Sequence, residues 1–126
     1  MDRYNVSKLL DLLWLRELST KVGGDIIVNG VNPGLCASAL HRSHSGVSSF
    51  NKVFAWSAEE GGHCLADAAT RYEQDQGAYI SEQVIKKPSN FVLSAEGQET
   101  QKRLFQETLS VLSDALSGVD LKTLVN

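Results

Sequence analysis

Two residues close to the start of the chain have the types and the spacing of an acid–base pair. Tyr4 and Lys8 are four positions apart in the segment Tyr-Asn-Val-Ser-Lys, so on a helix they share one face. A phenol ordinarily has a pKa of about 10, and a nearby ammonium lowers such a pKa because it favours the phenolate. The pair could therefore exchange a proton with an alcohol or a carbonyl, and Lys8 has spare donors for a sugar hydroxyl. An isolated pair at this spacing is more often a surface tyrosine packed on a lysine stem.

A long apolar helix is predicted to carry this pair. Its expected bounds are residues 3–21, and its apolar side chains fall on more than one face, whereas a surface helix usually has a single apolar stripe. The apolar positions are Leu9, Leu10, Leu12, Leu13, Trp14, Leu15 and Leu18. Such a helix needs cover on two sides: one cover could be a sheet, and the other is a neighbouring helix or a partner subunit.

The elements after this helix alternate between strand and helix, which is typical of an α/β fold. Gly23 and Gly24 end the helix, and the β-branched run that follows predicts a strand buried on both faces, as in a parallel sheet. The predicted elements are a strand over residues 25–31, a loop over 32–54, a helix over 57–72, a strand over 77–84 and a helix over 95–116. Two strands alone make a poor sheet, which indicates that further strands belong beside them.

The two later helices each have an apolar face at helical spacing. Ser57 followed by Glu60 fits a capping box at the start of the earlier one, and Ser94 is expected to cap the last helix. The expected apolar face of the earlier helix is Leu65, Ala68, Ala69 and Tyr72, and that of the last helix is Leu104, Phe105, Leu109, Leu112 and Leu116.

A second group of residues indicates that the tyrosine–lysine pair is more than a chance spacing. The helix leads into a strand that ends in an Asn-x-Val-x-Pro-Gly pattern, formed by Asn29, Val31, Pro33 and Gly34. Together with Ser7 directly before the lysine, this combination resembles the short-chain dehydrogenase/reductase family. The likeness continues in residues 57–61 and 77–80 and covers residues 1 to about 116. Residues 32–38 are most similar to fungal members of the retinol-dehydrogenase-like branch.

This resemblance implies a fold and a site. The fold would be the C-terminal part of a Rossmann-type doubly wound parallel sheet, with residues 1–126 as one partial domain and the nucleotide-binding first half missing. Tyr4 would be the proton donor and acceptor, and Lys8 would hold the nicotinamide ribose of NADP or NAD. The backbone of Pro33, Gly34 and Leu35 would lie beside the nicotinamide. Ser38 stands nearest to the threonine with which many members contact the cofactor.

The chain also departs from the family pattern. It contains no Gly-x-x-x-Gly-x-Gly motif for the pyrophosphate and no serine a dozen residues before Tyr4. We therefore expect a truncated oxidoreductase, acting on a small alcohol or carbonyl, that is inactive on its own. The alternative is a non-catalytic binding or regulatory remnant that pairs with a full-length relative through the first helix. A homo- or heterodimer through that helix fits its excess apolar surface, and a missing internal neighbour fits equally well.

Composition and cysteine usage limit the partners, the compartment and the metal content that we expect. A net charge of −3 without a basic run argues against nucleic acid as the main partner. No apolar run is long enough for a transmembrane helix, and residues 1–10 lack a secretory pattern. Cys36 and Cys64 are expected to be free thiols in a reducing compartment, so a cytoplasmic protein is predicted. His41 and His44 do not have the spacing of a zinc site, and no metal is expected.

Overall fold

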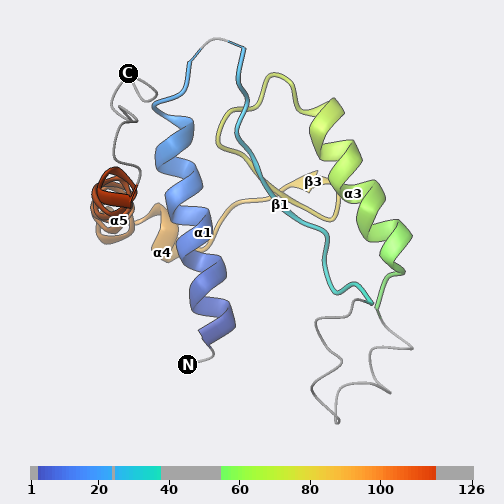
Figure 1. The fold of residues 1–126 in the computed structure, drawn as a ribbon. Coiled ribbons are helices and arrows are strands. Elements are labelled where there is room, and N and C mark those ends of the chain that lie inside the picture. The colour runs from blue at the N-terminus through green and yellow to red at the C-terminus, as the bar shows by residue number, and fades with distance from the viewer. Residues whose placement is uncertain (1–2, 24, 38–54, 116–126) are drawn as a thin grey trace. The chain divides into compact units, whose positions relative to one another are not determined.

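The computed structural model describes residues 3–23, 25–37 and 55–115. They form an α/β structure of helices and a three-stranded sheet (Figure 1), which confirms the α/β class. Its elements are α1 (Arg3–Ser19), β1 (Gly30–Asn32), α3 (Ala58–Arg71), β2 (Tyr79–Ser81), β3 (Val84–Ile85), α4 (Asn90–Leu93) and α5 (Ala95–Ala115). The chain divides into two compact units. The first comprises Met1–Gly30, Gln74–Ala78 and Lys87–Asn126, and the second comprises Val31–Glu73 and Tyr79–Lys86.

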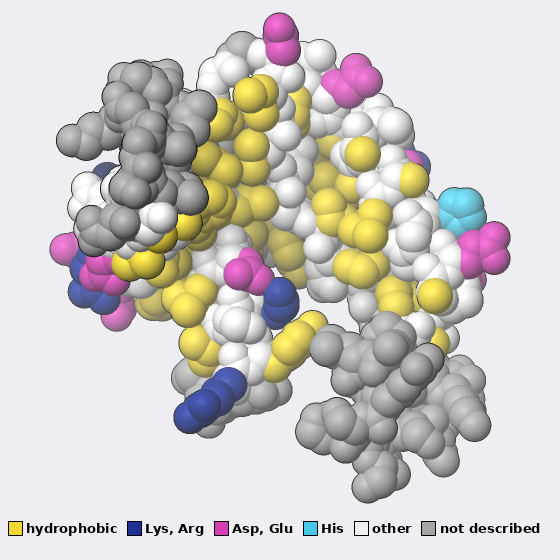
Figure 2. Space-filling model, in the orientation of Figure 1, with side chains coloured by type: hydrophobic (Ala, Val, Ile, Leu, Met, Phe, Trp, Pro, Cys, Tyr) yellow, Lys and Arg dark blue, Asp and Glu magenta, His cyan; other side chains and the backbone are white. Residues whose placement is uncertain are grey.

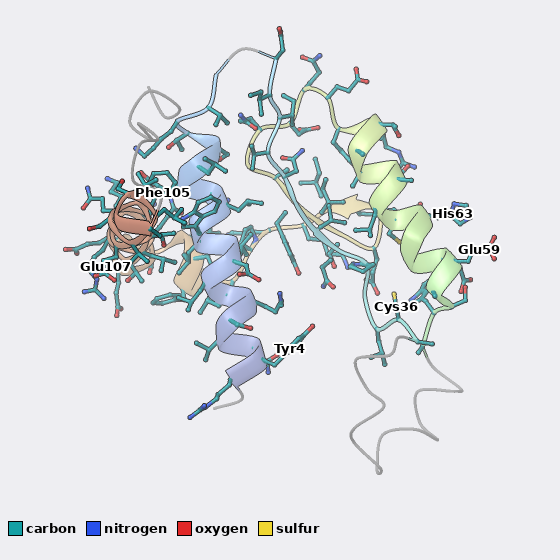
Figure 3. All side chains as sticks on the ribbon, viewed as in Figure 1. Tyr4, Cys36, Glu59, His63, Phe105 and Glu107 are labelled. Carbon is teal, nitrogen blue, oxygen red and sulfur yellow. The ribbon has the colours of Figure 1, made fainter. Side chains whose placement is uncertain are left out.

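The core of the first unit lies where α1 packs on α5. Leu13 and Phe105 (labelled in Figure 3) are each 1% exposed. The rings of Trp14 and Phe105 lie 5.5 Å apart between centroids. Burial of one such side chain contributes about 1.5–3 kcal/mol. The neighbouring helix α4 adds the buried Val92. Ser94 caps α5 as expected, because its Oγ accepts a hydrogen bond from the Gly97 amide at 3.1 Å.

A buried polar cluster sits in the same unit. The Glu17 carboxylate is 6% exposed. It accepts hydrogen bonds from the Gln101 side-chain amide at 2.8 Å and forms an ion pair with Lys21 at 3.0 Å. Both partners satisfy a group that would be costly to bury alone. The cluster therefore ties the end of α1 to the N-terminal half of α5.

The sheet has the order β1-β2-β3 and is mixed. Strands β2 and β3 are antiparallel, with Ile80 opposite Ile85. Between β1 and β2, the Gly30 amide donates to the Ala78 carbonyl and the Glu82 amide donates to the Asn32 carbonyl, each at 2.9 Å. The residue numbers rise together on the two sides, from 30 to 32 and from 78 to 82, so the two strands run parallel. The strand expected over residues 77–84 is thus a short strand followed by a hairpin.

The first strand is shorter than the predicted residues 25–31, and the reason is chemical. The Gln76 side-chain amide accepts a hydrogen bond from the Val28 amide at 2.7 Å and donates one to the Ile26 carbonyl at 3.1 Å. It thereby takes the place of a peptide group on a neighbouring strand, so a regular ladder begins only at Gly30. The expectation of burial on both faces is also wrong for this segment, because Ile26 and Ile27 are 58% and 42% exposed.

Helix α3 begins as the sequence predicts, and of its expected apolar face only Ala68 is buried. Ser57 and Glu60 form the complete capping box: each side chain accepts a hydrogen bond from the other's backbone amide. The buried residues are Gly61, Cys64 and Ala68. Leu65, expected in the core, is 53% exposed, and hydrophobic side chains are visible on the surface of this helix (Figure 2).

Candidate functional site

Tyr4 and Lys8 both lie on the first turns of α1, in the first unit. The Lys8 Nζ is 6.0 Å from the centroid of the Tyr4 ring, so the helix places the two polar groups on one side, as their spacing predicts. The Tyr4 side chain is 50% exposed and projects from the start of the helix (Figure 3). The Ser7 hydroxyl donates to the Tyr4 carbonyl at 2.8 Å. The pair is therefore accessible, with both reactive groups at the protein surface.

Asp11 forms a salt bridge with the lysine of this pair. Its Oδ2 accepts a hydrogen bond from the Lys8 Nζ at 2.7 Å. This hydrogen bond and the charge of Asp11 raise the pKa of Lys8 above its ordinary value, with a smaller contribution from Tyr4. Asp11 thus stabilises the protonated form of the lysine. Sequence reasoning missed Asp11, although its position three residues after Lys8 is the helical spacing at which a salt bridge forms.

The turn at Gly34, in the second unit, is built by its neighbours. Gly34 has φ +84, a backbone conformation that favours glycine. The Asn32 Oδ1 accepts a hydrogen bond from the Gly34 amide at 3.0 Å, and the Asn32 amide donates to the Tyr79 hydroxyl at 3.1 Å. A Cβ on Gly34 would lie 3.1 Å from the Glu82 carboxylate. Glycine is therefore required here for its conformation and for the close approach of Glu82.

The rest of the predicted cofactor segment continues from this turn. Leu35 is 41% exposed, and its carbonyl accepts a hydrogen bond from the Trp56 amide at 2.9 Å. Cys36 pairs with Trp56 in an isolated parallel bridge, and its Sγ packs against Gly61. Ser38 and the substrate loop up to residue 54 lie outside the described residues. Glu82 beside Gly34 was not predicted, because nothing in the local sequence links two residues 48 positions apart.

The described residues fit part of a nicotinamide cofactor by the chemistry of their donors. An ammonium and a phenol on one exposed helical face can meet the hydroxyls of a ribose. Pro33, Gly34 and Leu35 offer backbone groups in a turn without a side chain at its centre. The two sets of residues belong to different units, and each is described by itself.

The described part of the chain holds no cluster of metal-ligating side chains. Among residues 3–23, 25–37 and 55–115, no group of three His, Cys, Asp or Glu side chains could hold a metal ion. His41 and His44 lie outside that part. Cys36 and Cys64 are free thiols, as expected. None of the described helices has the length and apolar character needed to span a membrane.

Fold and residues together define an α/β chain that presents a phenol and an ammonium side by side on an exposed helix. Comparison with known proteins identifies the family to which such a chain belongs. The chain is 55% identical over 89 residues to the short chain dehydrogenase sol3 of Alternaria solani, an alignment that covers 69% of the chain and 31% of that protein. It is 35% identical over 123 residues to the short chain dehydrogenase/reductase dmxR8 of Cryptosporiopsis sp., covering 94% of the chain and 38% of the relative.

A further relative is the short-chain dehydrogenase anuD of Penicillium roqueforti, 31% identical over 134 residues, with 95% of the chain and 35% of the relative covered. No family model matches the chain, and no solved structure matches it significantly. The chain belongs to the short-chain dehydrogenase/reductase family and corresponds to a C-terminal portion of its members. It spans about a third of the length of the curated relatives that it matches.

Proposed function

We propose that this chain carries the acid–base pair of an NAD(P)-dependent short-chain oxidoreductase. The observation that supports the proposal most strongly is the placement of Tyr4 and Lys8 on one exposed face of α1, in a chain whose relatives are short-chain dehydrogenases. The sheet would be part of a Rossmann-type doubly wound sheet that the rest of the family polypeptide completes. The reaction would interconvert a small alcohol and a carbonyl.

The proton is handled by Tyr4 in this proposal. During reduction its hydroxyl gives a proton to the carbonyl oxygen, and during oxidation the phenolate takes the proton of the alcohol. The bound nicotinamide cofactor supplies or accepts the hydride. A positive charge beside Tyr4 stabilises the phenolate that remains after proton donation, and Lys8 provides that charge 6.0 Å from the ring centroid.

Lys8 has a second task, which is to hold a ribose hydroxyl of NADP or NAD. Its ammonium has three donors, of which one is occupied by Asp11. The side chains of Lys8 and Asp11 are 58% and 66% exposed, so solvent and a ligand can compete with Asp11 for the hydrogen bonds of the lysine. The turn at Pro33, Gly34 and Leu35 is proposed to meet the nicotinamide, and Ser38 to contact it.

The groups that seat the pyrophosphate and orient the substrate carbonyl are proposed to lie in the part of the family polypeptide that this chain does not span. Removal of a preorganised donor at a reacting oxygen typically costs about a hundredfold or more in rate. We therefore expect no turnover from the 126-residue chain alone. Purified chain with NADPH and a broad carbonyl panel tests this directly, and clear turnover contradicts it.

A fusion restores the missing part. The segment of the Alternaria solani relative that this chain does not span is joined to the chain, and oxidation of NADPH is followed with the same carbonyl panel. Tyr4→Phe should reduce turnover about a hundredfold or more, since a positioned acid or base contributes about that much. Tyr72→Phe is the matched control, because Tyr72 is a tyrosine of the second unit that bonds the Gln83 carbonyl. Equal turnover in the fusion and its Tyr4→Phe variant would show that Tyr4 is not the acid.

A further inference from the structure

The hairpin between β2 and β3 turns on two residues whose backbone conformation is unfavourable for their type. Glu82 and Gln83 have φ +52 and +65, and they lie between the paired residues Ser81 and Val84. Glycine adopts this left-handed conformation readily, whereas most other residues are destabilised in it. Two-residue hairpins usually have asparagine and glycine at these positions. A residue that is kept in such a conformation often belongs to a functional site.

Glu82 reaches the turn at Gly34 from this conformation. Its amide donates a hydrogen bond to the Asn32 carbonyl at 2.9 Å. Its side chain lies across Gly34, because a Cβ on that glycine would be 3.1 Å from the Glu82 Oε1, 3.3 Å from its Cγ and 3.6 Å from its Cδ. The main chain and the side chain of one residue therefore contact both ends of the segment from Asn32 to Gly34.

The side chain of Glu82 is oriented by Lys86. The Glu82 Oε2 accepts a hydrogen bond from the Lys86 Nζ at 2.7 Å, and Oε1 is the atom of Glu82 that comes nearest to a Cβ on Gly34. The Lys86 amide donates to the Tyr79 carbonyl at 2.8 Å, so the lysine is fixed on the same hairpin. Both side chains of the ion pair are about half exposed, and exposed pairs add little to stability. The pair therefore matters for the direction in which the carboxylate points.

Asn32 supports the same turn from its other end. Its Oδ1 accepts a hydrogen bond from the Gly34 amide at 3.0 Å, and its Nδ2 donates to the Tyr79 hydroxyl at 3.1 Å. An asparagine forms such a turn with local contacts alone. Gly34, however, has more conformational freedom than any other type of residue would have at that position. The side chain of Glu82 restricts this freedom, and all four residues belong to the second unit.

We propose that Glu82 is a positioning residue for the turn that meets the nicotinamide, a role that rests on the proposed function. A glycine lets the backbone approach a ligand closely, but it also leaves a turn free to adopt other conformations. The Glu82 side chain covers Gly34 from the hairpin and keeps the turn in one conformation before the cofactor binds. A turn that is ordered beforehand loses less entropy on binding. The unfavourable backbone of Glu82 thus lowers the stability of the hairpin and raises the affinity of the turn.

Replacing Glu82 with glycine separates these two effects. The variant is made in the fusion with the complementary part of the Alternaria solani relative, and binding of NADPH is followed by the fluorescence of its nicotinamide. Glu82→Gly relieves the unfavourable conformation, so the melting temperature should rise by about 2–4 °C. It also frees the turn, so the Kd for NADPH should rise about three- to tenfold. An unchanged Kd in Glu82→Gly overturns the proposal.

Two matched variants test whether the contact with Gly34 is the cause. Gln83→Gly relieves the same conformation at φ +65, but the Gln83 side chain bonds the Cys64 Sγ at 3.6 Å and not the turn. Its Kd for NADPH should stay within about twofold of the wild type. Glu82→Gln keeps the size of the side chain and should also bind within about twofold. If Glu82→Gln binds as weakly as Glu82→Gly, the charge acts directly on the cofactor and the positioning role is overturned.

A ligand without nicotinamide distinguishes a local effect from general damage. Binding of 2′-phospho-ADP-ribose, measured by calorimetry, should be the same in the wild-type fusion and in Glu82→Gly, because this ligand does not reach the turn. Equal weakening for this ligand and for NADPH overturns the positioning role. A wild-type fusion that binds neither NADPH nor NADH rejects the proposed function and this role with it. A wild-type fusion that binds NADPH no better than Glu82→Gly does rejects the role alone.

Discussion

Replacing Glu17 with alanine should destabilise the first unit through the partners that it leaves behind. The buried carboxylate accepts a hydrogen bond from Gln101 at 2.8 Å and pairs with Lys21 at 3.0 Å. A hydrogen bond to a charged group contributes about 1.5–3 kcal/mol, and the pair with the 35% exposed Lys21 side chain adds about 0.2–1 kcal/mol. Part of this is offset because the carboxylate no longer has to be buried. The expected net loss is about 2 kcal/mol.

Glu17→Gln is the matched variant, because it keeps the size and one acceptor oxygen. The Gln101 amide can still donate to that oxygen, so only the charge is lost and the cost should be about 1 kcal/mol or less. The two variants also differ from the wild type in pH dependence. Burial raises the pKa of Glu17, but the hydrogen bonds from Gln101 and Lys21 outweigh it and hold the pKa below its usual value. The stabilisation is therefore present above pH 4.5, the ordinary pKa, and is lost as the pH falls through the lower folded value.

Urea unfolding followed by tryptophan fluorescence measures these differences. Trp14 contacts Phe105 in the same interface, and a Trp56→Phe background leaves Trp14 as the reporter. The free energy of unfolding should fall in the order wild type, Glu17→Gln, Glu17→Ala, and in both variants it should decline less below pH 4.5 than in the wild type. Equal stability of the wild type and Glu17→Ala within about 0.5 kcal/mol, or an unchanged acid decline in Glu17→Gln, would refute the role assigned to this cluster.

Helix α3 offers two further predictions. Gly61→Ala should lower the free energy of unfolding in urea by about 1–3 kcal/mol, because its Cβ would lie 2.7 Å from the Cys36 Sγ. Gly62→Ala is the control, since nothing lies within 4 Å of a Cβ on Gly62. That substitution should stabilise the helix by about 0.5–1 kcal/mol. Equal effects at the two glycines would contradict the close contact. Ser57→Ala should cost about 1 kcal/mol and lessen the acid sensitivity of the cap, because only the backbone hydrogen bond to the Glu60 carboxylate remains. Hydrogen bonds from the Ser57 backbone and side chain hold the pKa of Glu60 below 4.5, so the cap weakens as the pH falls below that value. Helix content followed by circular dichroism from neutral to acid pH checks this, and a Ser57→Ala variant with the wild-type acid transition would count against it.

The sequence predicted those parts of the fold that depend on neighbours along the chain. The capping box of Ser57 and Glu60 spans three residues, and the bounds of α1 and α5 follow from helical spacing and from the cap at Ser94. The first strand was placed too early because its partner is the side chain of Gln76, about 50 residues away. Periodicity within the strand carries no information about such a partner.

The hairpin after β2 was missed for a different reason. Its two central residues, Glu82 and Gln83, have φ +52 and +65, a conformation that two-residue hairpins usually assign to asparagine and glycine. Here hydrogen bonds from other segments stabilise this conformation. The Glu82 amide donates to the Asn32 carbonyl, and the Gln83 carbonyl accepts hydrogen bonds from Tyr72 and Arg71. Tertiary contacts thus replace the local turn signal that sequence reasoning relies on.

The sequence predicted how Tyr4 and Lys8 lie on α1, but it did not predict their neighbour Asp11 or the approach of Glu82 to Gly34. The four-residue spacing of Tyr4 and Lys8 sufficed to place both on one face. The pairing of Lys8 with Asp11 also follows a helical spacing, but several acceptors at such spacings could have competed. Roles in a reaction are not contained in spacing, so Tyr4, Lys8, Pro33 and Gly34 keep their catalytic and cofactor roles as proposals.

The tyrosine–lysine pair and two isoleucines of the first unit are all exposed. A catalytic acid works in a site from which water is excluded and whose dipoles are fixed in advance, yet Tyr4 is half exposed and Lys8 is bound to Asp11 in solvent. The segment at Ile26 and Ile27 is likewise apolar but uncovered. For the proposed reaction we therefore expect further polypeptide to cover the tyrosine–lysine pair, since the described residues leave both side chains exposed.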